Sequence, residues 1–308
     1  MARYLDPKND LLFKKVFGEH KNLCISLLNS LLKFNGDAVI SEIEYEAVDT
    51  VCEIPVLKDS VVDVRCKDKA GRKFIVEMQM NRTKDFQQRV LFDASKIYVR
   101  SLKQSEDFSL LQSVYSLNLV NDKFDSDRAT ADLYYHRYNI ADTENAEKQI
   151  KGLQFIFIEL PKYKPKTQGE PDYFDLWLRY LTEINKDSVD ISPDFMKKKE
   201  LAQAIECIEE TALTPQERAL YDKIEDAIRV RRALLNGALE KGREEGRLEG
   251  RERGRLEGRF EGRLEGRLEG KLEIAAEMKR GGMADEKIAR FTGISLEEIR
   301  RCLSKGKK

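Results

Sequence analysis

Residues 61–80, with the sequence VVDVRCKDKAGRKFIVEMQM, constrain the fold more than any other stretch of the chain. Two apolar segments rich in β-branched and aromatic residues flank a polar turn, DKAG, in which Gly71 tolerates a positive φ. The pattern predicts a β-hairpin in which the numbers of cross-strand partners sum to about 140. In that register, Glu77 lies opposite Asp63 or one position away.

The two faces of this hairpin differ in chemistry. Side chains two apart on a strand share a face, so Gln79 accompanies Glu77. The opposite face is apolar and is expected to line the core with Phe74, Val76, Met78 and Met80. Two converging carboxylates repel each other, and their burial is costly unless they are paired or bind a cation. The expected result is a small polar cluster on a hydrophobic sheet.

Magnesium suits such a pair of acids. It prefers hard oxygen ligands, usually one or two carboxylates with waters and substrate phosphate, and it can activate a bound water for attack on phosphorus. The spacing of Asp63 and Glu77 therefore indicates phosphodiester hydrolysis. The pattern alone permits one alternative, an edge hairpin whose acids face solvent.

Asp63, followed after a short hairpin by Glu77-Met78-Gln79, resembles the PD-(D/E)XK nuclease fold in its E-x-Q variant. More narrowly, the chain is similar to the Rpn family of recombination-promoting nucleases, which also includes proteins described as transposases. The similar segments are DPKNDLLFKKVFG near the N-terminus, LKDSVVDVRCKDKAGRKFIVEMQM, the helix after it and the later FIFIELPKY. They extend from about residue 4 to about residue 165.

The resemblance implies a metal-dependent DNA endonuclease with an α/β core, a mixed sheet flanked by helices. It implies that Asp63 and Glu77 ligate Mg²⁺ or another divalent cation, helped by the Met78 carbonyl, and that Gln79 replaces the usual lysine. Glutamine carries no charge to stabilise a pentacovalent phosphorane, so it can only orient the water or a ligand. This departure leaves a rival open, a catalytically inactive DNA-binding or transposition-accessory protein that oligomerises through its C-terminal helix.

Hydrophobic periodicity predicts the elements around the hairpin. Asp10 is placed to cap a first helix, and because that helix often adds an acid to the site in this nuclease fold, Asp10 is also a candidate additional acid. Further helices are expected over 22–32 and around Trp177 over 172–184, with strands over 43–48, 113–120 and 153–160 and an edge strand over 133–138. We interpret Trp177 as a packing residue.

Residues 81–103 have the pattern of a long amphipathic crossover helix. Its apolar stripe, Phe86, Val90, Ala94 and Ile97, is expected to face the sheet. Basic residues are distributed around the helix, and Arg89, within about two turns of its start, is best placed to bind substrate phosphate. For most of the other bases, solvated surface charge is the favoured interpretation.

Charge offers no general attraction to nucleic acid, because Lys plus Arg equals Asp plus Glu at 55 each. A DNA-binding surface must therefore come from local clusters. The N-terminus lacks an apolar signal core, and no apolar run approaches the length of a membrane span, so we expect a cytoplasmic protein without a membrane partner.

Cysteine and histidine usage narrows the chemistry further. Five scattered cysteines without a C-x-x-C pair favour reduced thiols. With only His20 and His136 in the chain, zinc sites and histidine-based acid–base catalysis are not expected. We interpret both histidines as ordinary surface or turn residues.

We predict four segments: the PD-(D/E)XK nuclease domain over 1–190, a helical linker over 191–241, a repeat over 242–273 and a helix-turn-helix-like tail over 274–308. Within the linker, Thr214-Pro215-Gln216-Glu217 predicts a helix start with a capping box. The tail spaces Ile288, Gly293 and Ile299 like a helix-turn-helix. Because Glu297 and Glu298 would meet phosphates unfavourably, a DNA reader and a protein-binding tail both remain open.

The repeat is G-R-L-E with period four, and its nine bases balance its nine acids. In a helix each unit rotates by about 40°, so the rows spiral right-handedly, and like charges meet at i,i+4. We therefore predict a helix only within a homo-oligomer, most simply a dimer. There the Glu row lies against an Arg row, the glycines let backbones approach, and the leucines are buried. A disordered polyampholyte is the alternative.

Overall fold

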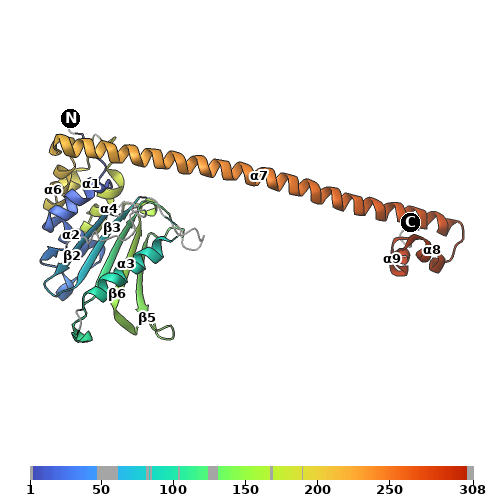
Figure 1. The fold of residues 1–308 in the computed structure, drawn as a ribbon, viewed down its shortest axis with the longest axis horizontal. Coiled ribbons are helices and arrows are strands. Elements are labelled where there is room, and N and C mark those ends of the chain that lie inside the picture. Colours follow the sequence, from blue (N-terminus) through green and yellow to red (C-terminus); the bar gives the residue numbers. More distant parts are fainter. Residues whose placement is uncertain are drawn as a thin grey trace. The chain divides into compact units, whose positions relative to one another are not determined.

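The computed structural model describes residues 3–46, 62–80, 83, 85–102, 105–123, 131–166, 169–188 and 190–303. They belong to two compact units, Met1–Ile228 and Arg229–Lys308. The first unit is built on a six-stranded sheet in the order β1-β2-β3-β4-β6-β5, with helices on its faces (Figure 1). The predicted α/β class, a mixed sheet flanked by helices with a long C-terminal helix, is confirmed.

The strands are β1 (Ile43–Tyr45), β2 (Val62–Asp68), β3 (Lys73–Gln79), β4 (Val114–Val120), β5 (Tyr135–Ala141) and β6 (Gln149–Glu159). β3, β4 and β6 are parallel neighbours, whereas β1, β2 and β5 pair antiparallel. The predicted edge strand is β5, which lies at the end of the strand order. Of the first strand expected over 43–48, residues 47 and 48 lie outside the described residues.

The hairpin has the predicted register. Val62 pairs with Met78 and Asp63 with Glu77, so the partner numbers sum to 140 as expected. Gly71 has φ 79°, and a Cβ there would lie 3.1 Å from the Gln112 Cγ. Glycine thus satisfies both the backbone conformation and the close approach at this turn.

The helices of the first unit are α1 (Asp10–Phe13), which continues as a π-helix over Lys14–Gly18, then α2 (Lys21–Leu31), α3 (Phe86–Arg100), α4 (Tyr173–Glu183), α5 (Pro193–Met196) and α6 (Lys199–Cys207). The prediction that Asp10 caps the first helix is wrong. The Asn9 side chain accepts a hydrogen bond from the Leu11 N–H at 3.1 Å, and Asp10 is the first helical residue. Either residue type can cap, so the pattern alone did not distinguish these neighbours.

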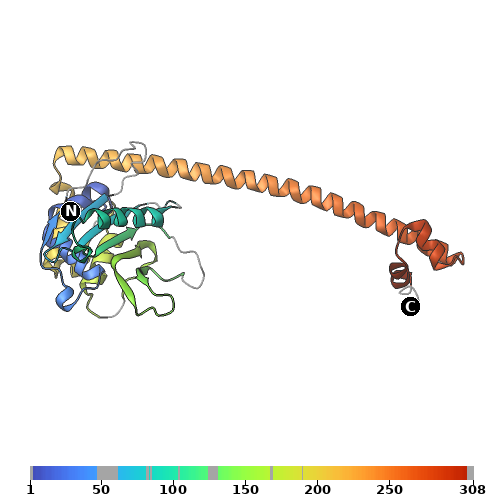
Figure 2. The same cartoon turned by 60° about the horizontal axis from the view of Figure 1, so that its bottom comes forward.

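Both faces of the sheet are covered. Phe74, Val76 and Met78 face the main core, which also contains α2, α4 and α6. On the other face, α3 packs its predicted stripe against the sheet, with Ala94 over Ile75 and Val114. Figure 2 shows α3 lying across this face. Because β3 and β4 are buried on both sides, they form near-continuous apolar strands interrupted by a few polar residues.

The predicted packing role of Trp177 is borne out. Its side chain is fully buried in α4, and its Nε1 donates to Ser26 Oγ at 3.0 Å. The Phe17 and Tyr180 rings contact its edges, with centroids at 5.4 and 5.6 Å. Large aromatic groups in such edge contacts contribute much of a core's stability.

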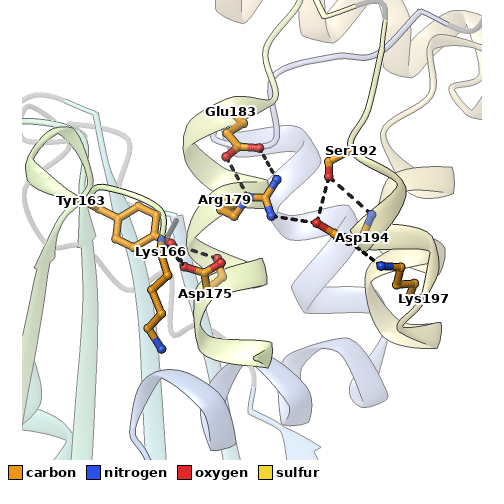
Figure 3. A network of polar contacts seen from close by, with 8 residues as sticks. All are labelled: Tyr163, Lys166, Asp175, Arg179, Glu183, Ser192, Asp194 and Lys197. Atoms are coloured by element: carbon orange, nitrogen blue, oxygen red, sulfur yellow. Dashed lines mark hydrogen bonds and ion pairs between the residues drawn. The ribbon is translucent and has the colours of Figure 1, made fainter. Parts of the chain in front are cut away.

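A polar network ties α4 to its neighbours (Figure 3). Asp175, 1% exposed, accepts a hydrogen bond from the Tyr163 hydroxyl and another from the Lys166 N–H at 3.3 Å. Burial, together with the Asp175 carboxylate, raises the pKa of Tyr163. Arg179 bonds to Glu183 at 2.8 Å, and it also reaches Asp194 on α5 at 3.4 Å (Figure 3). The turn that follows β6 is thereby fixed to the helical layer.

The helix α7 (Pro215–Arg280) begins with the predicted capping box. The Thr214 N–H donates to Glu217 Oε2 at 2.7 Å, and the Glu217 N–H donates to Thr214 Oγ1 at 3.2 Å. Its first turns belong to the first unit, where Lys15 pairs with Glu217 at 2.8 Å and the Asn9 Nδ2 donates to Glu225 at 3.0 Å. The repeat is helical throughout, unlike the disordered alternative.

In the second unit the end of α7 packs with α8 (Asp285–Thr292) and α9 (Leu296–Leu303). The small core contains Ala275, Ile288, Ile294 and Ile299. Gly293 has φ 68° between the two short helices, as a helix-turn-helix spacing predicts. Across the residues described, no helix is both long and apolar enough to cross a bilayer.

Candidate active site

The candidate site lies on the α3 face of the sheet, at the carboxyl end of β3. β3 has β2 on one side and β4 on the other, so it is an internal strand. Glu77 is only 4% exposed. The alternative in which this acid faces solvent from an edge hairpin is therefore wrong for Glu77. A buried carboxylate in the middle of a sheet requires compensating charge or hydrogen bonds.

Asp63 is placed by its backbone directly opposite Glu77 in the antiparallel ladder. Residues directly opposite each other in such a ladder project from the same face, with Cβ atoms about 4.5–5.5 Å apart. The fold thus brings the two predicted acids together on neighbouring strands. The side chain of Asp63 is outside the part of the chain whose side chains are described.

Gln79 is the last residue of β3 and lies two positions beyond Glu77, on the same face. Arg89 donates from Nη2 to Gln79 Oε1 at 2.6 Å. The Arg89 guanidinium also lies 5.5 Å from the centroid of the Phe86 ring on the same helix. The one base that the sequence singles out as a substrate ligand therefore reaches the residue that replaces the usual lysine.

Asp93 is a feature that sequence reasoning missed. Burial raises the pKa of this carboxyl, and the nearby positive charges of Arg65, Arg89 and Lys96 oppose the rise. Asp93 follows Arg89 by four residues, so the two share a face of α3. That spacing was the available signal. The α3 face therefore combines acids and bases that are partly withdrawn from water.

Met78 and Asp10 contribute less to the candidate site than Glu77, Gln79 and Arg89 do. The Met78 side chain is 1% exposed and faces the main core, so only its backbone carbonyl is available as a ligand. Asp10 lies at the start of α1, and its role as an additional acid stays a prediction. On β4, Asn118 pairs with Glu77 in the parallel ladder, but its Nδ2 donates to the Ile156 carbonyl at 3.1 Å. Asn118 thus joins β4 to β6.

A second polar cluster follows β6. Glu159 is fully buried, and its Oε1 lies 2.9 Å from His136 Nε2 and 2.8 Å from Lys162 Nζ. His136 is 9% exposed, so its interpretation as a surface or turn residue is wrong. The cluster lies in E-L-P-K, where an acid and a base three apart end an apolar strand. That pattern could have indicated a buried pair.

The donor set suits a hard divalent cation. Asp63, Glu77 and Gln79 provide carboxylate and amide oxygens, and Met78 provides a carbonyl, whereas none of them provides nitrogen or thiolate. Among the side chains that are described, no group of three His, Cys, Asp or Glu residues would hold a metal ion.

Comparison with known proteins gives one match. The family model for PD-(D/E)XK nuclease family transposases matches residues 7–238, well over half of the chain. This range contains the hairpin, α3 and the cluster after β6. No curated protein and no solved structure matches the chain.

Proposed function

We propose that this chain, which belongs to the PD-(D/E)XK nuclease family transposases, is a metal-dependent DNA endonuclease that acts in recombination or transposition. Asp63 and Glu77 hold a divalent cation, Mg²⁺ in the first place, with the Met78 carbonyl as a further ligand. The observation that carries the proposal is the pairing of Asp63 with the buried Glu77 across two internal strands. We place the activity in the cytoplasm.

The chemistry of the site follows from its oxygen donors. A bound cation would neutralise two adjacent carboxylates, polarise a phosphodiester oxygen and lower the pKa of a bound water. The protein contributes position: Glu77 is fixed within the ladder between β2 and β4, and α3 covers the same face of the sheet. Preorganised ligands of this kind avoid rearrangement during the reaction.

Arg89 resolves the difficulty that Gln79 raises. Glutamine has no charge, but the Arg89 guanidinium donates to its Oε1 at 2.6 Å, so a positive charge lies within hydrogen-bond distance of the side chain at position 79. Guanidinium donates to phosphate oxygens in a planar, bidentate geometry. We propose that Arg89 stabilises the charge that develops on the scissile phosphate, while Gln79 orients Arg89 and the attacking water.

The test is cleavage of plasmid DNA by the purified full chain with Mg²⁺ and with EDTA. Asp63→Ala and Glu77→Gln should each abolish cleavage, and EDTA should do the same. Glu144→Ala, which removes an exposed carboxylate far along the chain, is the matched control and should cut normally. Circular dichroism confirms that each variant folds. Undiminished cutting by folded Asp63→Ala would contradict the proposal.

The absence of a lysine at position 79 favours one rival, a catalytically inactive DNA-binding or transposition-accessory protein. In this case the wild-type chain would bind DNA and cut none with Mg²⁺ or Mn²⁺. Fluorescence anisotropy on labelled duplex DNA separates the two functions. The nuclease proposal expects Glu77→Gln to bind DNA while cleaving none, and the rival expects the wild type to behave in the same way.

We also propose that the chain acts as a homo-oligomer through residues 242–273. Exposed ion pairs alone stabilise an assembly little, but a row of exposed leucines and two complementary rows of charge support pairing with another copy. An endonuclease with two sites is suited to cutting two strands.

A further inference from the structure

The repeat over 242–273 presents four rows of side chains along a continuous helix. At about 100° per residue, Gly, Arg, Leu and Glu take successive positions around the axis, and each unit of four shifts the pattern by about 40°. The Leu row is therefore flanked by the Arg row on one side and by the Glu row on the other. The Gly row lies opposite the Leu row.

Most of the apolar row is uncovered by the described residues, and its last member, Leu272, packs against the small core of the second unit. Leu248, Leu256, Phe260, Leu264 and Leu268 are between 45% and 67% exposed. An exposed row of large apolar residues on a charged helix is characteristic of a surface that binds another helix. Isolated exposed apolar residues require no explanation, but five that recur at multiples of four, in one row that winds around the helix, do.

The charged rows are also incompletely satisfied within the chain. Among the described residues of the repeat, two ion pairs join its own charges: Arg253–Glu257 at 2.9 Å and Arg255–Glu252 at 3.6 Å. Both involve the one unit in which Glu252-Arg253 replaces Leu-Glu. A third pair, Lys241–Glu245 at 3.9 Å, lies at the start of the repeat. Regular units thus keep their Arg and Glu residues apart.

The glycines serve no steric need within the chain. A Cβ added at any position from Gly242 to Gly270 would meet nothing within 4 Å. Each glycine nevertheless costs up to about 1 kcal/mol relative to alanine in a helix interior. With like charges at i,i+4 as well, the isolated helix is poorly stabilised, so its stability must come from a contact that the single chain does not contain.

We propose that the repeat binds the same segment of a second copy as a parallel two-helix pair that coils right-handedly, so that the winding Leu rows stay opposite each other. Symmetry decides the direction. In a parallel pair, the twofold axis runs along the helices and places the Arg row of one chain beside the Glu row of the other on both flanks. In an antiparallel pair, Arg would face Arg and Glu would face Glu.

The preference for a parallel pair does not depend on which row is central, because Arg and Glu flank both the Leu row and the Gly row. Burial of the leucines selects the Leu row, since each buried side chain contributes on the order of 1.5–3 kcal/mol. The Arg row of each chain then lies beside the Glu row of the other, and this attraction fixes the parallel orientation. The occupant of the apolar row is thus a second copy of this chain, independently of whether the first unit is a nuclease.

The orientation is tested by cross-linking in the full chain. Leu248→Cys and Leu264→Cys should each form a disulfide-linked dimer with itself, because parallel partners place each position opposite its own copy. Leu220→Cys, exposed on α7 outside the repeat, is the control for chance cross-linking. In a mixture of a size-tagged Leu248→Cys chain and an untagged Leu264→Cys chain, no mixed dimer should form. A mixed dimer, or no dimer from either variant, would overturn the parallel pair.

The charge rows are tested separately by light scattering. Wild type should have twice the mass of one chain at low salt and should dissociate in high salt, because screening weakens exposed ion pairs. Arg259→Glu, Arg263→Glu and Arg267→Glu together should give a monomer. Adding Glu261→Arg, Glu265→Arg and Glu269→Arg exchanges the two rows and should restore the dimer. A wild-type monomer, a larger assembly, or failure of the exchange to restore pairing would refute the proposal.

Discussion

The first unit and the repeat reach secondary structure by opposite means. In the first unit, β3 and β4 are covered on both faces, so tertiary burial supplies the stability and polar residues such as Glu77 are exceptions. In the repeat nearly every residue is exposed, Gly270, Lys271 and Leu272 at its end being half-buried, and local sequence alone disfavours the helix. In the first unit the buried polar residues indicate where a functional site lies, whereas in the repeat the exposed apolar residues indicate where a partner binds. In both regions these residues are few, and the packing around them gives no structural reason for them.

The largest effect is expected from a substitution that removes a buried aromatic side chain from the core of the first unit. Trp177→Ala should destabilise this unit by about 3–5 kcal/mol, because it creates a large cavity and leaves Ser26 without its indole donor. Urea denaturation followed by fluorescence or circular dichroism measures the change. Phe92→Ala, which truncates an aromatic residue that is 66% exposed on α3, is the control and should change stability little. An equal loss of stability in the two variants would contradict the conclusion that burial stabilises the first unit.

The second prediction concerns the exceptional polar residues. Arg89→Ala should lower kcat by about 10²–10³-fold, as the loss of a charge-stabilising donor does in other enzymes, while DNA binding weakens less. Gln79→Ala should likewise cost turnover more than binding. Gln79→Lys should retain or raise activity, and it should also rescue Arg89→Ala by restoring a cation at the end of β3. A folded but inactive Gln79→Lys variant would count against this role.

The third prediction is that substitutions in the repeat stabilise its helix, whereas substitutions in a packed core usually destabilise it. Replacing Gly254, Gly258 and Gly262 by alanine should stabilise the helix by up to about 1 kcal/mol each, because an added Cβ would meet none of the described residues within 4 Å. Thermal unfolding monitored at 222 nm reports the change, and light scattering shows whether pairing survives. Destabilisation or loss of the dimer would instead place the glycine row inside the interface.

The smallest expected effect is a pH dependence where α7 starts. The hydrogen bond from Lys15 and the Thr214 N–H lower the pKa of Glu217 from 4.5 to about 2. A lowered pKa in the folded state stabilises the protein above pH 4.5, and this contribution disappears as the pH falls toward 2. Glu217→Gln should therefore weaken the protein slightly at pH 7 and flatten its acid dependence. An unchanged acid limb would contradict the pairing with Lys15.

Much of the fold could be predicted from local pattern because the turn and the strands constrain each other. The glycine at position 71 and the flanking apolar residues fixed the register that pairs Asp63 with Glu77. The period of the apolar residues in α3 predicted which side faces the sheet. Both inferences rest on interactions between residues that are near in sequence or related by one hairpin.

What could not be predicted depends on partners distant in sequence. The burial of His136 arises from its pairing with Glu159 across two strands, and nothing near His136 indicates it. Burial raises the pKa of the Asp93 carboxyl, and the charge that opposes this rise most, Arg65 of β2, is 28 positions earlier. At Asn9 and Asp10, two adjacent residues both suited to capping left the helix start uncertain by one position. Tertiary packing decides the first two, whereas a local hydrogen bond decides the third.

The bond between Arg89 and Gln79 divides the proposed chemistry between two elements of different rigidity. The metal ligands would lie on strands locked by ladders on both sides, whereas the positive charge comes from α3, which rests on the sheet through Phe86, Val90 and Ala94. A charge held by side-chain packing can be displaced without disturbing the ligands. A protein partner that slides or tilts α3 would then move the Arg89 charge away from the site. The rate of cleavage would fall, while the affinity for the metal would stay unchanged.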